Sequence, residues 1–260
     1  MKKTLDIEGT YGFFSGEIVG NILLLSFEEN LMQQATNLDA KTVFFDYLDL
    51  VSESDSLKVV LILSSPNKPG RNEYIEFFNR VIQRKSDIGV VLRMFNAFDQ
   101  CILKIQEMNQ IVIHTNSGKV LPLFLNASLA CDYRIVADNT VFQNPCLEFG
   151  LVPKGGGAFF LSRILGVSKA YKIMLSEEDI TAHEAMELGL VDEVVPFDEL
   201  RDAAFKTAGQ FASKPARSLR CCKRLLNYSL KDLREYLEFE TQELTNLIGP
   251  FGNGLAQDAH

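Results

Sequence analysis

The sequence predicts an α/β fold in which helices cover a mostly parallel sheet. Two observations predict it: short apolar runs alternate with longer amphipathic segments up to residue 196, and the chain beyond that residue is helical in pattern. Strands that alternate with helices usually join in parallel through helical crossovers. A chain of 260 residues is long enough for one such core with a small appendage.

Strands are expected where apolar residues run together without a helical period. Residues 18–27 (IVGNILLLSF) and 59–64 (VVLILS) have the composition of buried strands. Shorter strands are expected at 111–114, 134–137 and 140–143. His114, at the end of one of them, is expected to be a hydrogen-bonded core histidine, whereas His183 is expected at the surface.

Helices are expected between these strands. Residues 40–51 place five apolar side chains on one face: Val43, Phe44, Tyr47, Leu48 and Val51. The other expected helices cover 72–82, 91–107, 122–130, and a segment that follows 154–157 and ends near Gly166. Pro122 begins the helix at 122–130, where its missing N–H costs nothing.

Three amphipathic segments without partner strands follow Pro196, at 200–214, 216–229 and 230–247. We therefore divide the chain into an α/β core (1–196), a helical region (197–248) and a tail (249–260). The tail contains three closely spaced glycines and a proline and is expected to be disordered.

Charge and cysteine content narrow the class of protein. A net charge of −8 and a pI near 5.0 argue against nucleic acid or an anionic membrane as the main partner. No apolar segment follows Lys2 and Lys3 as in a signal peptide, and no apolar run is long enough to span a membrane. Five irregularly spaced cysteines predict reduced thiols and a cytoplasmic location, and no Cys or His cluster has the spacing of a metal site.

The most informative stretch is 131–166, CDYRIVADNTVFQNPCLEFGLVPKGGGAFFLSRILG, followed by ITAHEAMELGLVDEVVP at 180–196. This pattern resembles the enoyl-CoA hydratase/isomerase family, the crotonases, and a weaker likeness extends over 16–247. The resemblance implies a crotonase-like ββα superhelix (spiral) core with a C-terminal helical trimerisation appendage. It also implies a homotrimer or a hexamer built as a dimer of trimers, and an acyl-CoA or acyl-carrier thioester as substrate without a further cofactor.

The family polarises the thioester carbonyl with two backbone N–H groups. By resemblance, the first donor falls in the turn at Gly70 and Arg71, although an ordinary turn between a strand and a helix has the same composition. The second falls on Leu123, at the start of an apolar helix where the family has glycines. A helix N-terminus still offers N–H groups to an oxyanion, but the leucine side chain and Pro122 crowd that position.

The two glutamates that hydratases use are replaced. By position they correspond to Asn126 and Cys146. Asparagine cannot take up a proton at neutral pH, although it can hold a water or a carbonyl. Cys146 could act as a nucleophile or a weak acid if its pKa is lowered, but a buried cysteine is more often structural. Hydration by the two-carboxylate route is therefore not expected.

Glu148 and Lys154 are the acid and base that remain near this segment. Glu148 shares a face with Cys146 if the stretch is extended. Lys154 pairs with Glu148, faces a negatively charged group of the substrate, or lies exposed in a turn. Farther on, three arginines with helical spacing form a basic stripe that could bind CoA phosphates or be an ordinary charged face: Arg217, Arg220 and Arg224.

Two hypotheses follow from these residues. The first is a divergent family enzyme that isomerises, decarboxylates or hydrolyses an acyl thioester. The second is a catalytically inactive member that binds an acyl ligand or a partner protein. An open cavity lined by Asn126, Glu148 and Lys154 would favour the first, and a site filled by Leu123 and Phe124 would favour the second.

Overall fold

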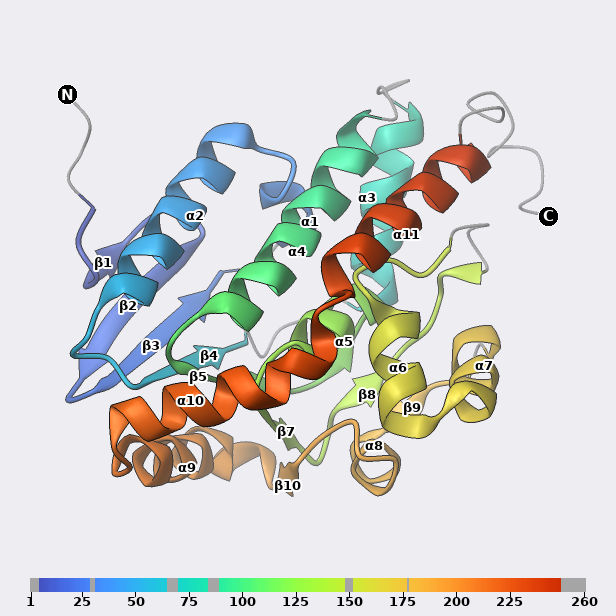
Figure 1. Ribbon diagram of the computed structural model, residues 1–260. Coiled ribbons are helices and arrows are strands. Elements are labelled where there is room, and N and C mark those ends of the chain that lie inside the picture. Colours follow the sequence, from blue (N-terminus) through green and yellow to red (C-terminus); the bar gives the residue numbers. More distant parts are fainter. Residues whose placement is uncertain are drawn as a thin grey trace.

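The computed structural model describes residues 5–28, 31–64, 70–83, 89–147, 152–176 and 178–248, with the side chains of residues 80–83 excepted. A seven-stranded sheet forms the centre of the fold (Figure 1), in the order β1-β2-β3-β4-β5-β7-β10. Its strands are β1 (Gly9–Thr10), β2 (Phe14–Val19), β3 (Ile22–Phe27), β4 (Val59–Leu63), β5 (Ile111–Asn116), β7 (Tyr133–Ala137) and β10 (Glu193–Val195). The pairs from β3 to β10 are all parallel, which confirms the predicted sheet.

The prediction of a single strand at 18–27 is wrong. The structure has an antiparallel hairpin there, in which Val19 of β2 pairs with Ile22 of β3. Gly20 turns the chain with a φ of 62°, a left-handed conformation that glycine adopts without steric cost. The apolar residues on both sides of Gly20 hide this turn in the sequence.

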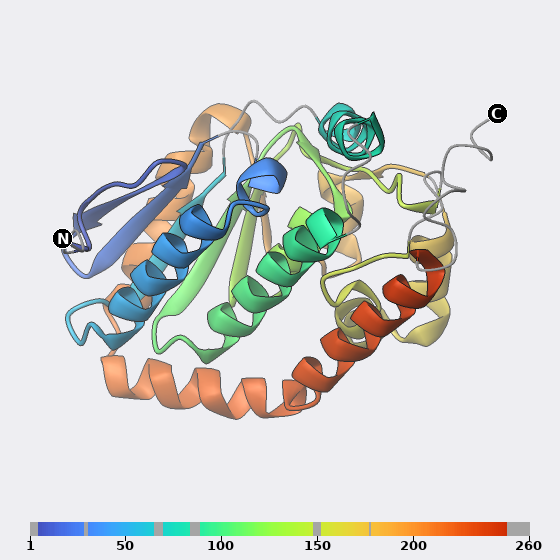
Figure 2. The same cartoon turned by 90° about the horizontal axis from the view of Figure 1, so that it is seen from above.

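Helices cover the two faces of the sheet (Figure 2). One face carries α2 (Leu38–Glu53) and α4 (Gly89–Glu107), and the opposite face carries α9 (Leu200–Ala212). Side chains alternate along each strand, so that Val60 and Ile62 of β4 pack toward α2 and α4, whereas Leu61 packs toward α9. Val43 is the exception to the predicted buried face of α2, because its side chain is exposed.

Smaller elements surround one edge of the sheet. They are α1 (Leu31–Gln34), α3 (Arg71–Gln83), α5 (Pro122–Leu129), α6 (Gly157–Leu165), α7 (Val167–Leu175) and α8 (Ala182–Glu187). A second, three-stranded sheet joins β6 (Lys119–Val120), β8 (Val141–Phe142) and β9 (Ile180–Thr181). No helix among the described residues is long and apolar enough to cross a lipid bilayer.

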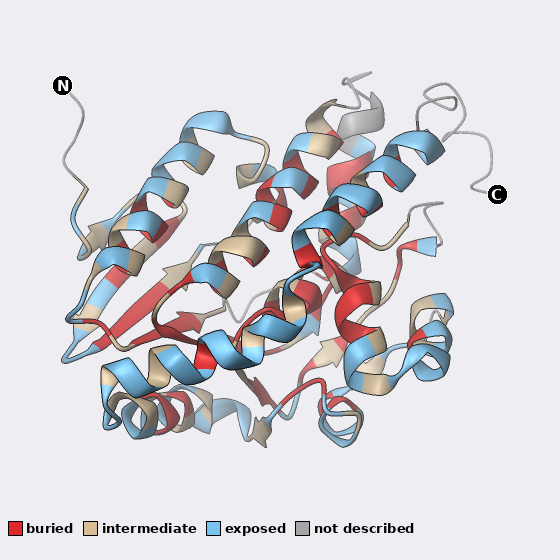
Figure 3. Cartoon of the chain, in the orientation of Figure 1, coloured by how far each residue is buried: buried red, intermediate tan, exposed pale blue. Residues whose placement is uncertain are grey.

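The C-terminal helices pack on the core of their own chain. A short 3-10 turn, η2 (Phe197–Glu199), precedes α9, and a second one, η3 (Tyr228–Leu230), separates α10 (Ala216–Asn227) from α11 (Leu233–Ile248). Leu233, Leu237 and Leu244 of α11 are buried, but Leu225 and Leu226 of α10 are 77% and 75% exposed. The exposed outer surface of α10 is visible in Figure 3. The predicted trimer stays a prediction, and the exposed leucines of α10 are one apolar surface that a partner subunit could cover.

Candidate functional site

Helix α5 organises the candidate site. It follows Leu121, whose carbonyl accepts hydrogen bonds from the N–H groups of Phe124 and Leu125. Phe124 and Ala127 of α5, and Cys131 just beyond it, are spaced by three and four residues and line a large cavity on one side. Pro122, Leu125 and Asn126 line a much smaller space of about 40 Å³ on the other side. The helix therefore separates two spaces of different size.

Asn126 occupies the smaller side and is held there. Its Nδ2 donates a 2.8 Å hydrogen bond to the Lys154 carbonyl, and only 3% of the residue is exposed. Residues 155–157, which we call the glycine turn, follow Lys154 and lead into α6, and they pack against Asn126 so closely that a Cβ on Gly157 would lie 2.7 Å from Asn126 Nδ2. Asn126 thus fastens α5 to this turn, and there is little room beside it for a substrate and a water.

Cys146, which the sequence analysis predicts to replace the second hydratase glutamate, is buried. Its Sγ lies 3.9 Å from the hydroxyl of Tyr74, and burial raises the pKa of the thiol to about 11. The group is therefore a neutral thiol at physiological pH, which supports the structural interpretation of this cysteine.

Lys154 is buried in an ion-pair cluster with partners that the sequence analysis missed. Its side chain is 0% exposed, and Nζ lies 3.0 Å from Asp99 Oδ2 and 3.6 Å from Glu240 Oε2. Nζ also donates to Thr241 Oγ1 at 2.9 Å. The expectation of an exposed lysine in a turn is wrong. The proposed partner, Glu148, lies outside the described residues, and the partners that are described lie on α4 and α11.

The cluster holds one cation and two carboxylates, so it is neutral when one proton is bound. Burial raises the pKa of Glu240 to about 7 and also raises the pKa of Asp99 above its usual value. The Gly156 N–H donates to Glu240 Oε2 at 3.1 Å, which ties α11 to the glycine turn. The cluster thus joins α4, α11 and the turn that supports Asn126.

We expect this cluster to make stability depend on pH. Because the folded protein holds the Glu240 proton more tightly than the unfolded chain, the stabilisation is present below about pH 4.5 and is lost as pH rises through about 7. Glu240→Gln should remove this contribution. As pH rises from 5 to 8, the free energy of unfolding of the variant should therefore increase by about 1–3 kcal/mol relative to that of the wild type. Urea unfolding at several pH values measures the difference, and parallel stability curves for the two proteins would contradict it.

The predicted backbone donors differ in their surroundings. The Arg71 N–H is already used, because it donates to Gln143 Oε1 at 3.0 Å. Gly70 has a φ of 60°, and a Cβ there would lie 2.5 Å from both Gln143 Oε1 and the Lys119 side chain. The Leu123 N–H has no acceptor among the described residues, although its side chain is buried in the cluster between α3, α4 and α11. The Leu123 N–H therefore remains a candidate donor to the thioester oxygen. The Arg71 N–H could serve as a donor only after breaking its hydrogen bond to Gln143.

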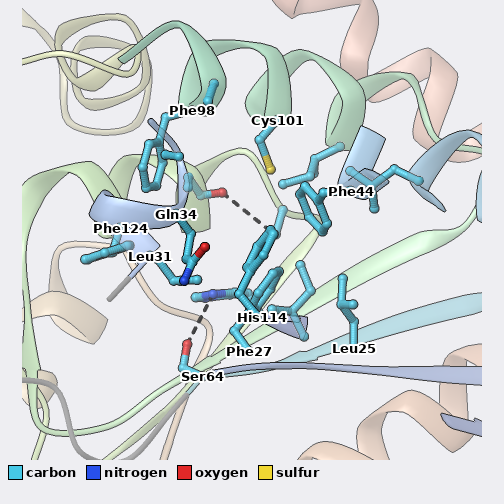
Figure 4. A pocket seen from close by; sticks show the side chains of 18 of the residues that line it. Leu25, Phe27, Leu31, Gln34, Phe44, Ser64, Phe98, Cys101, His114 and Phe124 are labelled. Carbon is cyan, nitrogen blue, oxygen red and sulfur yellow. Dashed lines mark hydrogen bonds between the residues drawn. The ribbon is translucent and has the colours of Figure 1, made fainter. Parts of the chain in front are cut away.

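The large cavity has a volume of about 150 Å³ and lies between the sheet and helices α2 and α4. Its floor consists of inward-facing residues of neighbouring strands: Leu25 and Phe27 of β3, Val60 and Ile62 of β4, and Val112 and His114 of β5. Its roof includes Phe44 and Leu48 of α2 and Phe98, Cys101 and Ile105 of α4. Figure 4 shows the rings and aliphatic chains that converge on this space. An apolar cavity of this kind binds an apolar group in preference to water.

Polar side chains lie at one end of the cavity, at the carboxyl ends of the strands. Ser64 follows β4, and its Oγ lies 3.4 Å from His114 Nε2 (Figure 4). His114 Nδ1 lies 3.0 Å from Asn116 Nδ2 and 3.2 Å from Ser128 Oγ. The expected hydrogen-bonded core histidine is therefore confirmed, but its half-buried ring also lines a cavity. His183 lies at the surface, as expected.

The basic stripe of Arg217, Arg220 and Arg224 lies near the amino ends of the strands. Arg220 forms an ion pair of 3.3 Å with Asp55, in the loop before β4, and Arg217 and Arg224 are exposed. Within one chain the stripe is therefore at the amino ends of the strands, opposite Ser64 and His114. Its predicted role in binding CoA phosphates remains untested.

Comparison with known proteins gives the family. Residues 92–250 match the family model of enoyl-CoA hydratase/isomerase. The chain is 28% identical over 199 residues to a crotonyl-CoA hydratase of Syntrophomonas wolfei, covering 76% of this chain and 74% of that protein. It is also 28% identical over 179 residues to a probable enoyl-CoA hydratase of Mycobacterium tuberculosis, covering 68% of this chain but 63% of that relative. The chain belongs to the enoyl-CoA hydratase/isomerase family, as the sequence motifs indicate.

Solved structures confirm the fold. An enoyl-CoA hydratase from Bacillus halodurans superposes with a TM-score of 0.78 at 21% identity, over 91% of this chain and 95% of that one. The Pseudomonas aeruginosa protein DspI superposes with a TM-score of 0.73 at 20% identity, over 100% of this chain and 94% of that one. The crotonase-like core predicted from the sequence is therefore confirmed.

Proposed function

We propose that the protein binds an acyl-CoA or acyl-carrier thioester, with the acyl chain in the apolar cavity, and does not hydrate it. The observation that carries this proposal is the position of α5 between two unequal spaces. On the smaller side Asn126 is engaged with Lys154, whereas on the other side Phe124 and Ala127 line a cavity of about 150 Å³. An engineered apolar cavity of about 150 Å³ binds benzene, so an acyl chain of about six carbons is a reasonable occupant.

Three of the residues considered for acid/base chemistry support binding rather than hydration. Asn126, Cys146 and Lys154 are all buried and have structural contacts. This favours the inactive acyl-binding member over the two-carboxylate mechanism. A second candidate is isomerisation, decarboxylation or hydrolysis of the bound thioester. The carboxylate of Glu73, on the first turn of α3, favours it because Glu73 lines the cavity and could exchange a proton with the acyl group.

Filling the cavity tests the binding proposal. Ala127→Phe places a ring where the acyl chain would lie, and we expect it to weaken hexanoyl-CoA binding at least tenfold in isothermal titration. The matched control is Ala203→Phe, a half-buried position of α9 on the opposite face of the sheet, which should leave the affinity unchanged. Free CoA should bind both variants as it binds the wild type. Equal affinity of hexanoyl-CoA for wild type and Ala127→Phe would exclude this cavity as the acyl site.

Hydration of crotonyl-CoA should be at or near background. Asn126 cannot take up a proton from water, and the Cys146 thiol is held neutral by burial. The double change Asn126→Glu with Cys146→Glu should restore little, because the first carboxylate would face the Lys154 carbonyl and Arg71 N–H is engaged with Gln143. The loss of enoyl absorbance with time is the measurement. Robust hydration by the wild type would show that the assignment of these two positions is wrong.

A further inference from the structure

We propose that Ser64 and His114 bind the carbonyl oxygen of the acyl group, whose chain then extends along the sheet toward Met108. The inference rests on the proposed acyl-thioester binding and assigns two side chains to the contact for which the family uses backbone N–H groups. It follows from the direction of the cavity, the tautomer of His114 and the chemistry of the two donors.

The cavity has a polar end and an apolar end. Along β4, the inward-facing residues are Val60, Ile62 and then Ser64, and His114 of β5 pairs with Ile62. Four steps of about 3.3 Å separate Val60 from Ser64, so the floor is roughly 13 Å long. Met108 lies just before β5, at the amino ends of the strands, and so marks the apolar end. An acyl group that enters at the carboxyl ends therefore has its oxygen beside Ser64 and its methyl end near Met108.

The surrounding hydrogen bonds orient the imidazole. Asn116 Nδ2 can only donate, so at 3.0 Å it makes His114 Nδ1 an acceptor and leaves the ring proton on Nε2. Nε2 faces Ser64 Oγ at 3.4 Å, and this hydroxyl donates to Asn116 Oδ1 at 3.3 Å. Both distances exceed the usual range, so the Ser64 hydroxyl is held weakly and can turn toward a ligand oxygen.

The chemistry of the pair suits a neutral acceptor. An N–H and an O–H converge at the end of an apolar cavity, where a hydrogen bond to a carbonyl is stronger than in water. The Arg71 N–H is already used by Gln143, whereas the Ser64 hydroxyl and the His114 Nε2–H lie at the end of the cavity itself.

A cycle that changes both the ligand and the protein tests this contact. Hexanoyl-CoA is compared with its thioether analogue, S-hexyl-CoA, which lacks only the carbonyl oxygen. Wild type, Ser64→Ala, His114→Phe and the double variant are titrated with both ligands, and melting temperatures establish that each variant is folded. Ser162→Ala is the matched control, because this half-buried serine of α6 bonds only the Phe159 carbonyl among the described residues.

We expect the wild type and Ser162→Ala to prefer the thioester by about five- to a hundredfold, the value of two neutral hydrogen bonds. Ser64→Ala and His114→Phe should each reduce that preference, and the double variant should bring it close to one, while the affinity for the thioether stays unchanged. If the wild type binds both ligands without a preference, or if the preference survives both changes, Ser64 and His114 do not bind the carbonyl oxygen. The acyl-binding proposal would still stand. If the wild type binds neither ligand, both proposals fail.

Discussion

Lys154→Met should lower the free energy of unfolding by about 3–5 kcal/mol, because it leaves two buried carboxylates without their cation. Nζ lies 3.0 Å from Asp99 and 3.6 Å from Glu240, and all three side chains are at most 9% exposed. Part of the loss will be offset when Glu240 takes up a proton, since its pKa is already raised to about 7. Urea unfolding at pH 8, where that proton is least available, gives the largest difference.

Removing the carboxylates as well should restore most of this loss. The triple variant Lys154→Met, Asp99→Asn, Glu240→Gln has no buried charge in the cluster, and neutral or apolar replacements of buried ion pairs are often tolerated. We therefore expect it to be more stable than Lys154→Met alone. If the triple variant is less stable than the single one, the cluster contributes through packing and not through charge compensation.

The same cluster also bears on the acyl site. Lys154 bonds Asn126 through its carbonyl, and Glu240 bonds Gly156 through its carboxylate. Both contacts hold the glycine turn against α5, whose other side lines the cavity. We therefore expect variants of the cluster to affect stability more than acyl affinity, since none of its charged groups lines the cavity.

The fold was predictable because each element has a local pattern. The apolar strands at 59–64 and 111–114 and the amphipathic helix at 91–107 occur within two residues of the expected ends. The β2–β3 hairpin was missed because only Gly20 marks its turn within an apolar run. Val43 was misassigned because a helical stripe does not show where the face that contacts the sheet ends.

The site was less predictable because its contacts join residues far apart in the chain. The family resemblance predicts that Asn126 and Cys146 replace the hydratase carboxylates, and this stays a prediction. The resemblance could not indicate that Lys154 pairs with Asp99 and Glu240, which are 55 and 86 residues away. Asp99 did give a local signal, because it is the one acidic residue on the otherwise apolar buried face of α4. The cavity itself depends on how α2 and α4 meet the sheet, which periodicity does not specify.

Lys223 is the second charged residue whose loss should have a large effect. The sequence places it beside the basic stripe, but the structure buries it, with Nζ 2.7 Å from Asp132 Oδ2. Nζ also donates to the carbonyls of Ile105 at 3.0 Å and Gln110 at 2.9 Å. It thus fastens α10 to the end of α4 and to the turns that lead into β5 and β7.

Lys223→Met should therefore cost about 3–5 kcal/mol of stability, because it removes a cation from a partly buried carboxylate and leaves two carbonyls without their donor. Arg224→Met, the exposed neighbour on the same helix, is the matched control and should change the free energy of unfolding by at most about 0.5 kcal/mol. Adding Asp132→Asn to Lys223→Met should recover only part of the loss, because the Ile105 and Gln110 carbonyls stay without the Lys223 donor. Equal stability of Lys223→Met and Arg224→Met in urea would show that α10 is held by its apolar contacts alone.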